Sequence, residues 1–532
     1  MVPSGGRWTG GDGYPRGGTD VDFALQAGGD APLYQQIRDG LRREVVAGTL
    51  PAGARLPSSR LLARDLGVSR ITVTTAYAEL EADGVIESRA GAGTFVLPPW
   101  PLAAHHAAPA TTDVWPAWQA GLAGRSNPER DRMLSQVLRG PLGPDTVNFS
   151  WGAGDPRLVP TAEFRRVLTE VLDEDGAAAL GPEHADGYPP LRRALTGYLR
   201  QLGLDVGPDD ILITAGTQQV IAMVAATLVQ PGDRVVVEAP TWPGALDAFQ
   251  ARGAVIVDVP VDADGMRVDL LEAILERERP RLIYTIPTFQ NPTGAVMSAA
   301  RRRALVTLAA RHGVPILEDD HVREVRFGDP IPPPLAAFDR HGNVIHASSF
   351  TKSLIPALRL GYVVARGPLR EWLTSLKRTS DLFSSTLLQR ALCRYLEQGA
   401  VQRHWRRVSR VYRHRHATMQ AALAEHFPAG STWSGVAGGI VVWVGVPPGV
   451  SVATLYGEAL EAGASFVAGE AFFAEPADQP FLRLNFAALD DDQIERGIAI
   501  LGRVLRDHLG ASAGALPMTS PRGERLRSAP PT

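Results

Sequence analysis

A proline-, alanine- and histidine-rich stretch divides this chain into two folding units. It begins at residue 98 with PPWPLAAHHAAPATT and continues without a periodic apolar pattern to about residue 144. Segments of this composition are extended and act as spacers between domains. We therefore predict a small unit over residues 30–97, a linker over residues 98–144 and a large unit over residues 145–510.

The chain ends and the overall composition set further limits. Residues 1–29 are rich in glycine and residues 511–532 in serine, proline and arginine, so we predict disordered tails there. The net charge is −3, and the single cysteine, Cys393, excludes disulfides and fits a reducing compartment. The N-terminus has no signal-peptide pattern, and no apolar run is long enough to span a bilayer. We expect a cytoplasmic protein with no membrane partner.

The small unit shows three helical patterns followed by two short strands. In APLYQQIRDGLRREVVAG, apolar residues recur at four-residue spacing, and PSSRLLARDLG is a shorter helix with Ser58 as its N-cap. Ser69 begins a third helix, VSRITVTTAYAELEADG, and VIESRAGAGTFV forms two strands around a glycine-containing turn. This order, with a tight LGVS turn between helices two and three, indicates a winged helix-turn-helix.

The run from Leu33 to Val96 resembles the DNA-binding domain of the GntR superfamily of bacterial regulators. The resemblance implies that helix two meets phosphates, that the start of helix three enters the major groove, and that the wing approaches the minor groove. An arginine at the start of a recognition helix can also make a bidentate contact with guanine. The residues expected at DNA are Arg55, Ser58, Arg60, Ser69, Arg70, Thr72, Gly91 and Gly93.

Charge alone does not predict this DNA contact. Residues 30–97 contain eight arginines and eight carboxylates, so the small unit is neutral. A positive potential at DNA requires uneven placement, with Glu79, Glu81 and Asp83 kept at the far end of helix three.

Helical and strand-like segments alternate in the large unit, which predicts an α/β domain with a largely parallel sheet. Several short strands end in polar residues, and such strand ends are where α/β proteins bind ligands. TAGTQQ forms a strand-to-helix turn suited to phosphate, PTFQNPTG places Asn291 in a turn, and ILEDDH ends in carboxylates. Each signal taken alone has an ordinary structural explanation as a helix cap, a turn or a strand end.

Lysine is nearly absent from the chain. All but two of the 54 lysine and arginine residues are arginines, and the exceptions are Lys352 and Lys377. Lys352 lies between hydroxyl residues in SSFTKSLIPALRLGYVV. Lysine, unlike arginine, can lose its proton and form an imine with an aldehyde. Lys352 is therefore the candidate nucleophile, whereas the surroundings of Lys377 indicate no role.

Together these segments resemble a fold-type I aminotransferase that binds pyridoxal 5′-phosphate (PLP). The resemblance extends from about Val147 to FLRLNFAAL near residue 488. It implies that Lys352 is the Schiff-base lysine and that Arg483 binds the α-carboxylate of a small ligand. Around the cofactor it implies Thr217, Gln218, Ser349 and Arg359 at the phosphate, Trp242 stacked on the ring, Asn291 and His321 near the ring hydroxyl, and Asp319 at the ring nitrogen. No metal site is expected.

The order of the two units resembles the MocR subfamily of GntR-type regulators. The resemblance implies a homodimeric, head-to-tail transcriptional regulator that binds operator DNA and senses PLP or an amino compound at Lys352. Two alternatives stay open: an active aminotransferase with a DNA-binding appendage, and a regulator of PLP biosynthesis whose effector is PLP. The arginine-rich segment 403–416 is either a solvated helix face or a second DNA contact.

Overall fold

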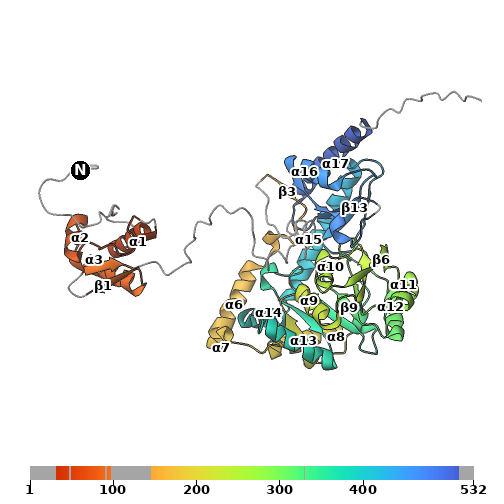
Figure 1. The fold of residues 1–532 in the computed structure, drawn as a ribbon, viewed down its shortest axis with the longest axis horizontal. Coiled ribbons are helices and arrows are strands. Elements are labelled where there is room, and N and C mark those ends of the chain that lie inside the picture. Colours follow the sequence, from red (N-terminus) through yellow and green to blue (C-terminus); the bar gives the residue numbers. More distant parts are fainter. Residues whose placement is uncertain are drawn as a thin grey trace, which may run out of the picture. The chain divides into compact units, whose positions relative to one another are not determined.

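In the computed structural model the chain divides into two compact units (Figure 1). The described residues are 25, 31–46, 49–89, 93–97, 145–328, 330–477 and 479–514. The predicted linker and most of both predicted tails lie outside these residues. Leu25 packs against the core of the small unit, and helix α17 (Asp491–Gly514) runs four residues beyond residue 510. Among the described residues, no helix is both long and apolar enough to cross a membrane.

The small unit is a winged helix-turn-helix, as predicted (Figure 1). Ser58 Oγ accepts the Leu61 N–H to cap the second helix, and Ser69 Oγ accepts the Thr72 N–H to cap the third. Gly67 takes the left-handed conformation that the turn between these helices requires. The elements are α1 (Leu33–Val46), α2 (Ser59–Leu66), α3 (Arg70–Ala82), β1 (Ile86–Arg89) and β2 (Gly93–Val96), with the two strands antiparallel.

The main sheet of the large unit has the strand order β4–β11–β10–β9–β8–β5–β6–β7. Strand β11 is antiparallel to both neighbours and β7 is antiparallel to β6, whereas the remaining strands run parallel. The strands are β4 (Ile211–Thr214), β5 (Arg234–Ala239), β6 (Val255–Asp262), β7 (Gly265–Met266), β8 (Leu282–Thr285), β9 (Ile316–Asp319), β10 (Val344–Ser349) and β11 (Gly361–Val364). Because parallel strands share a direction, their carboxyl ends meet at one edge of the sheet.

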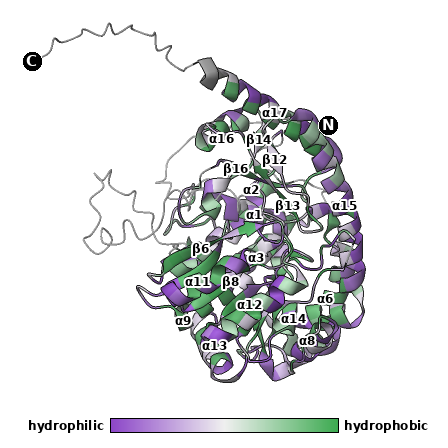
Figure 2. Ribbon diagram, turned by 90° about the vertical axis from the view of Figure 1, so that its right-hand side faces the viewer, coloured by the Kyte–Doolittle hydropathy of each residue, from purple (hydrophilic) through white to green (hydrophobic). Residues whose placement is uncertain are grey.

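The central strands of this sheet carry hydrophobic residues on both faces, and helices cover both faces (Figure 2). Leu212 of β4 faces one helical layer, and its neighbours Ile211 and Ile213 face the other. One layer contains α9 (Thr217–Leu228), α10 (Pro243–Gln250) and α13 (Gly367–Ser380). The other contains α6 (Thr161–Asp175), α7 (Ala177–Leu180), α8 (Pro189–Gln201), α11 (Val268–Glu278), α12 (Ala299–His312), α14 (Thr386–Glu397) and part of α15 (Ala400–His426).

A second sheet, with the order β12–β13–β16–β15, lies in the C-terminal part of the large unit. It shares a hydrophobic core with α15 and α17. A short parallel pair joins β14 to β3, and so brings the start of the large unit to this part of the chain. The elements are β3 (Val147–Asn148), β12 (Thr432–Trp433), β13 (Val441–Gly445), α16 (Val452–Glu461), β14 (Ala464–Ser465), β15 (Val467–Ala468) and β16 (Phe481–Asn485).

Two glycines let strand β11 lie directly against the start of helix α9. A Cβ added to Gly361 would lie 2.6 Å from the Ser348 carbonyl oxygen and 2.8 Å from the Gly216 Cα. Both contacts are with backbone atoms, which cannot rotate away. Gly216 itself has a φ of 116°, a conformation that other residues rarely adopt. The close approach therefore fixes where the first turn of α9 begins.

We expect Gly361→Ala to destabilise the large unit by about 1–3 kcal/mol, the usual cost of overpacking a core. Gly457, inside α16, is a matched control because an added Cβ there would have no atom within 4 Å. Gly457→Ala should stabilise the unit by about 0.5–1 kcal/mol, since alanine favours a helix over glycine. Scanning calorimetry of both variants tests this, and an unchanged midpoint for Gly361→Ala would contradict the close approach.

Candidate functional site

A group of hydrogen-bond donors that could bind an oxyanion lies where α9 begins. It consists of the N-terminus of α9 at Thr217 with Ser349, Thr351 and Arg359, and we call it the oxyanion cup. Gly216 precedes the helix, and no side chain caps its first turn. A Cβ on Gly216 would lie 3.5 Å from Arg359 Nη2 and 3.8 Å from both Ser349 Oγ and Thr351 Oγ1. A helix N-terminus, two hydroxyls and a guanidinium thus converge, which is the chemistry that binds a phosphate. The structure brings the predicted residues Thr217, Ser349 and Arg359 together and adds Thr351.

Arg359 occupies this cup with an unusual backbone. It follows a 3-10 turn, Pro356–Leu358, and has a φ of 46°, in the left-handed region. For a residue other than glycine, such a conformation costs on the order of 1–3 kcal/mol and is concentrated at functional sites. The side chain is exposed, so its guanidinium is accessible to a ligand.

Gln218 and Trp242 form a second wall next to the cup. The Trp242 Nε1–H donates to Gln218 Oε1 at 2.9 Å, and Gln218 Nε2 donates to the Gly244 carbonyl oxygen at 2.7 Å. The Gln218 side chain therefore holds the indole, and the backbone N–H of this residue at the start of α9 is available to a phosphate. The partly buried Trp242 ring packs against two hydrophobic clusters, one of which includes residues of α9 and α10. In this position the ring is suited to stack on a planar ligand.

Buried polar atoms without partners lie at and just after the carboxyl ends of the neighbouring strands β8 and β9. Asp319 is 3% exposed at the end of β9; Tyr284 donates to its Oδ2 at 3.0 Å, but its Oδ1 has no hydrogen bond among the described residues. His321 Nδ1 lies 3.5 Å from that oxygen and also lacks a hydrogen bond, as does Asn291 Oδ1. Unpaired buried polar atoms are costly, so they indicate that a ligand completes the set. A protonated ring nitrogen is a suitable partner for the Asp319 carboxylate.

Two cations, Lys352 and Arg483, bind the same loop at residues 150–152. Lys352 Nζ donates to the Gly152 carbonyl oxygen, and Arg483 Nη2 donates to the Ser150 carbonyl oxygen at 3.0 Å. Burial, with the positive charges of Arg483 and Arg359, lowers the pKa of Lys352 to about 8. A substantial fraction of its amine is therefore neutral and nucleophilic near neutral pH.

Arg483 itself is a buried cation without a counter-ion. It is 2% exposed, and burial lowers its pKa to about 10. Within the described part of the chain no carboxylate pairs with it, and its Nε has no hydrogen bond. A buried guanidinium in this state is expected to bind the carboxylate of a ligand.

The second lysine supports the cup from behind. Lys377 is fully buried, and its Nζ lies 2.8 Å from both oxygens of Asp381. Asp381 also accepts a bond from Gln219 Nε2 at 2.9 Å, and Gln219 Oε1 accepts the Ala215 N–H at 2.8 Å. Lys377 thus positions the strand-to-helix turn through Asp381 and Gln219, a role that its local sequence does not indicate.

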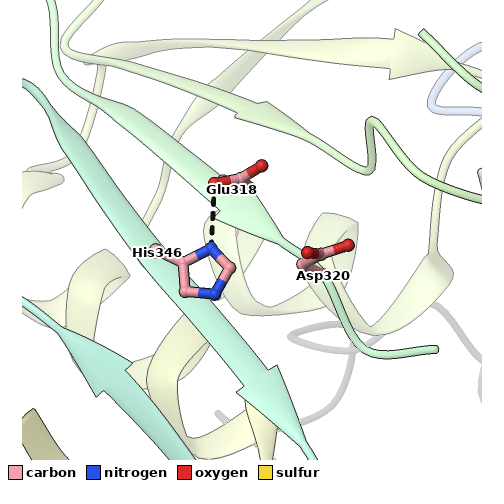
Figure 3. Close-up of side chains that lie close together, drawn as sticks. All are labelled: Glu318, Asp320 and His346. Atoms are coloured by element: carbon pink, nitrogen blue, oxygen red, sulfur yellow. Dashed lines mark hydrogen bonds and ion pairs between the residues drawn. The ribbon is translucent and has the colours of Figure 1, made fainter. Parts of the chain in front are cut away.

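One group of described residues has the composition of a metal site. Ligand-type atoms of Glu318, Asp320 and His346 lie within 4.8 Å of one another (Figure 3). However, His346 Nδ1 is bonded to Glu318 Oε2 at 2.9 Å, and Arg323 pairs with Asp320. Burial opposes a charge on His346, but Glu318 outweighs it and raises the pKa of His346. Cations of the chain itself compensate these carboxylates, so the group forms a buried charge network behind Asp319.

Two of the predicted DNA residues cap helices, and several of the others have exposed side chains. Ser58 and Ser69 cap helices, and the Ser69 hydroxyl also lies 2.8 Å from Thr72 Oγ1. Arg60 and Arg70 are exposed, and Arg70 Nε donates weakly to Ser59 Oγ at 3.4 Å. The exposed residues that remain on this face are suited to reach a groove or a phosphate.

The wing and the far end of α3 complete this interface. The Arg55 side chain lies against Gly93, where a Cβ would be 2.7 Å from Arg55 Nε; Gly91 lies outside the described residues. Arg38 pairs with Glu79 at 2.8 Å, and Arg42 pairs with Asp83. Arginines of α1 therefore compensate Glu79 and Asp83 at the far end of α3, and Arg60 and Arg70 are exposed near its start.

Sequence reasoning missed one exposed apolar residue on this face. Ile71, in the first turn of α3, is 77% exposed. An exposed apolar side chain on a recognition helix is able to contact a thymine methyl group in the major groove. The sequence did contain a signal for it, because Ile71 is an apolar residue that lies outside the apolar stripe of α3.

Known proteins resemble both units. The chain matches the family "Bacterial regulatory proteins, gntR family" over residues 33–96 and "Aminotransferase class I and II" over residues 147–501. It is 32% identical to an uncharacterized HTH-type transcriptional regulator, YdfD, of Bacillus subtilis, covering 90% of this chain and 97% of that protein. It is also 32% identical to the probable rhizopine catabolism regulatory protein MocR of Rhizobium meliloti, covering 94% and 100%.

Solved structures resemble the large unit. The α-aminoadipate aminotransferase LysN of Thermus thermophilus, complexed with N-(5′-phosphopyridoxyl)-L-leucine, is 33% identical. The likeness covers 74% of this chain and 100% of that protein with a TM-score of 0.69. That ligand combines a phosphate, a planar ring and a carboxylate, and these are the groups that the cup, the Trp242 wall and Arg483 are suited to bind.

We expect the Lys352 amine to react with formaldehyde and cyanoborohydride at a rate that rises with pH and is half-maximal near pH 8, since only the neutral amine attacks. Arg483→Met should shift this midpoint upward, because it removes a positive charge that lowers the pKa of Lys352. Isotope-coded methylation followed by mass spectrometry measures the rate for each peptide. Arg413→Gln, an exposed charge on α15, is the control, and equal midpoints in both variants would contradict the proposed coupling.

Proposed function

Because this chain belongs to the MocR subfamily of GntR-type regulators, we propose that it is a transcriptional regulator that reads an amino compound through PLP. The observation that supports the proposal is that neighbouring strand ends of one sheet carry an oxyanion cup, a buried Asp319 oxygen without a partner and, just after β10, a lysine with a lowered pKa. The winged helix-turn-helix supplies the DNA-binding half. We propose that the protein acts in the cytoplasm, where operator DNA is present.

Each side chain has a defined task in this proposal. Thr217, Ser349 and Arg359, with Thr351 and the Gln218 N–H, hold the PLP phosphate. Asp319 accepts the proton of the ring nitrogen, and Tyr284 orients this carboxylate. The residues proposed at the ring are Trp242, Asn291 and His321, of which His321 acts beside Asp319.

Lys352 and Arg483 are proposed to recognise the effector. PLP supplies an aldehyde that binds amines covalently and a ring that withdraws electrons. Lys352 provides the amine that anchors it, and Arg483 binds the carboxylate of an incoming amino compound. Both cations also bind the loop Ser150–Gly152, so a ligand that draws either of them away changes that loop. This loop is therefore the first candidate for the segment that transmits ligand binding at Lys352 and Arg483 to the rest of the protein.

We propose that the protein works as a head-to-tail homodimer, in which two winged helices read the two halves of an operator. Dimeric helix-turn-helix proteins bind half-sites that are spaced by whole helical turns. This arrangement rests on the resemblance to MocR-type regulators.

A working aminotransferase is the second candidate, because Lys352, Asp319 and Arg483 leave amine chemistry open. We expect the purified protein to take up PLP with a visible absorbance band that Lys352→Ala lacks. Candidate amino acids should then change this band once, without multiple turnovers when an oxoacid is added, and should alter the affinity for operator DNA. Stopped-flow absorbance and gel-shift titration measure the two effects.

Each other outcome of this experiment identifies an alternative. Sustained turnover with an oxoacid contradicts a pure sensor and favours the enzyme. DNA binding that responds to PLP and to no amine favours a regulator of PLP biosynthesis. A wild-type absorbance band in Lys352→Ala contradicts the assignment of the lysine.

We expect Arg70→Ala to weaken binding to operator DNA by about fivefold to a hundredfold and to relax the preference at one base pair. Operator sequences can be selected from random DNA with the wild-type protein. Arg43→Ala, an exposed arginine on α1, is the matched control and should change the affinity by less than about twofold, because a solvated charge away from the recognition helix contributes little. Equal losses in both variants would contradict base reading by Arg70.

A further inference from the structure

The arginine-rich segment 403–416 divides into two faces of helix α15. On one face the side chains bind the domain itself: Arg407 donates to the Leu158 carbonyl oxygen, and Arg415 forms a buried pair with Asp155 at 2.7 Å. On the other face Arg406, Arg410 and Arg413 recur at helical spacing. The segment is therefore neither uniformly solvated nor uniformly available to DNA.

The second face lines a cavity of about 710 Å³. A volume of this size is typical of sites for small molecules. The cavity lies between α8, α15 and the segment after β9, of which residues 323–328 and 330–333 are described. Its lining arginines are Arg323, Arg326, Arg406, Arg410 and Arg413.

The charge of this cavity is strongly unbalanced. Glu324 is the only carboxylate among its described lining residues, and burial raises the pKa of Glu324. Arg323 is paired with Asp320, but within the described part of the chain neither Arg406 nor Arg410 has a carboxylate partner. Guanidinium groups crowded in this way repel one another unless an anion lies between them.

A buried donor also lacks a partner in the cavity wall. Trp405 is 7% exposed, and its Nε1–H has no hydrogen bond among the described residues. Gln402 and Glu324, which line the same cavity, each carry a buried oxygen without a partner. Native proteins satisfy most buried polar groups. The Trp405 donor is suited to the oxygen of an anion, whereas the two oxygens are acceptors that water or a donor group of the ligand has to satisfy.

We propose that this cavity is a second ligand site, separate from the Lys352 pocket, which binds a small anion carrying two or more phosphate or carboxylate groups. Arg406 and Arg410 bind its oxygens, and the Trp405 Nε1–H donates to it after a small local adjustment. A compact anion fits better than a DNA backbone, because the arginines converge on a hollow with a buried donor in its wall. Arg323 joins this hollow to Asp320, the neighbour of Asp319.

The test is titration of the full-length, PLP-loaded protein with inorganic pyrophosphate by isothermal calorimetry. Loading with PLP fills the phosphate cup at Arg359, so that the added anion reports on the cavity. We expect the double variant Arg406→Gln/Arg410→Gln to bind pyrophosphate at least about tenfold more weakly, since two charge-assisted contacts are lost. Trp405→Phe should weaken binding by about threefold to tenfold while keeping the ring.

The matched control is Arg403→Gln/Arg407→Gln, which removes the same charge from α15 at residues that do not line the cavity. It should change pyrophosphate binding by less than about twofold. Equal losses in the two double variants would show an effect of net charge only and overturn the proposal. Absence of pyrophosphate binding to the wild-type protein would also overturn it. If Arg406→Gln/Arg410→Gln lost affinity for operator DNA while its pyrophosphate binding stayed unchanged, this face would be a DNA contact and the proposal would be wrong.

Discussion

The PLP-type pocket depends on compensated charges buried at the end of β9. Glu318 accepts the N–H groups of Leu335 and Ala336 and the ring of His346, while Arg323 pairs with Asp320. Removing one member of such a network leaves an uncompensated charge in a low dielectric, which is far more costly than the pair itself. Asp319 lies between these two anchored residues, and so its carboxylate is held rigidly with one oxygen free. The neighbouring strands then bring the cup and the lysine to the same edge.

The features that the sequence indicates most directly are those encoded in a few neighbouring residues. The helix caps Ser58 and Ser69, the turn before Thr217 and the isolated Lys352 each carry their signal within a few neighbours. The winged helix-turn-helix and the α/β sheet followed from periodicity and segment order, and both were confirmed. Placing Lys352 beside Arg483 required the resemblance, because the two are far apart in the chain.

What the sequence could not predict depends on strand pairing and on long-range contacts. Tyr284 reaches Asp319 only because β8 lies beside β9, and Lys377 acts on the cup through Asp381 and Gln219. The arginine-rich segment looked uniform as a string of letters, but the packing of α15 separates its members. No local sequence pattern distinguishes Arg415, which forms a buried ion pair with Asp155, from the solvated arginines near it in the segment. The predicted tails and linker are largely outside the described residues and stay predictions.

The pairing of α1 with the acidic end of α3 has a consequence for how the small unit finds its target. Carboxylates of α3 hold Arg38 and Arg42 in ion pairs, so these two arginines are less available to the phosphates of DNA. Binding to random DNA is driven by released counterions and scales with the number of phosphates neutralised. A DNA-binding domain that makes few phosphate contacts has a short residence time on non-specific chromosomal DNA. Its occupancy at an operator is then set mainly by base recognition and is diluted little by the excess of competing sequence.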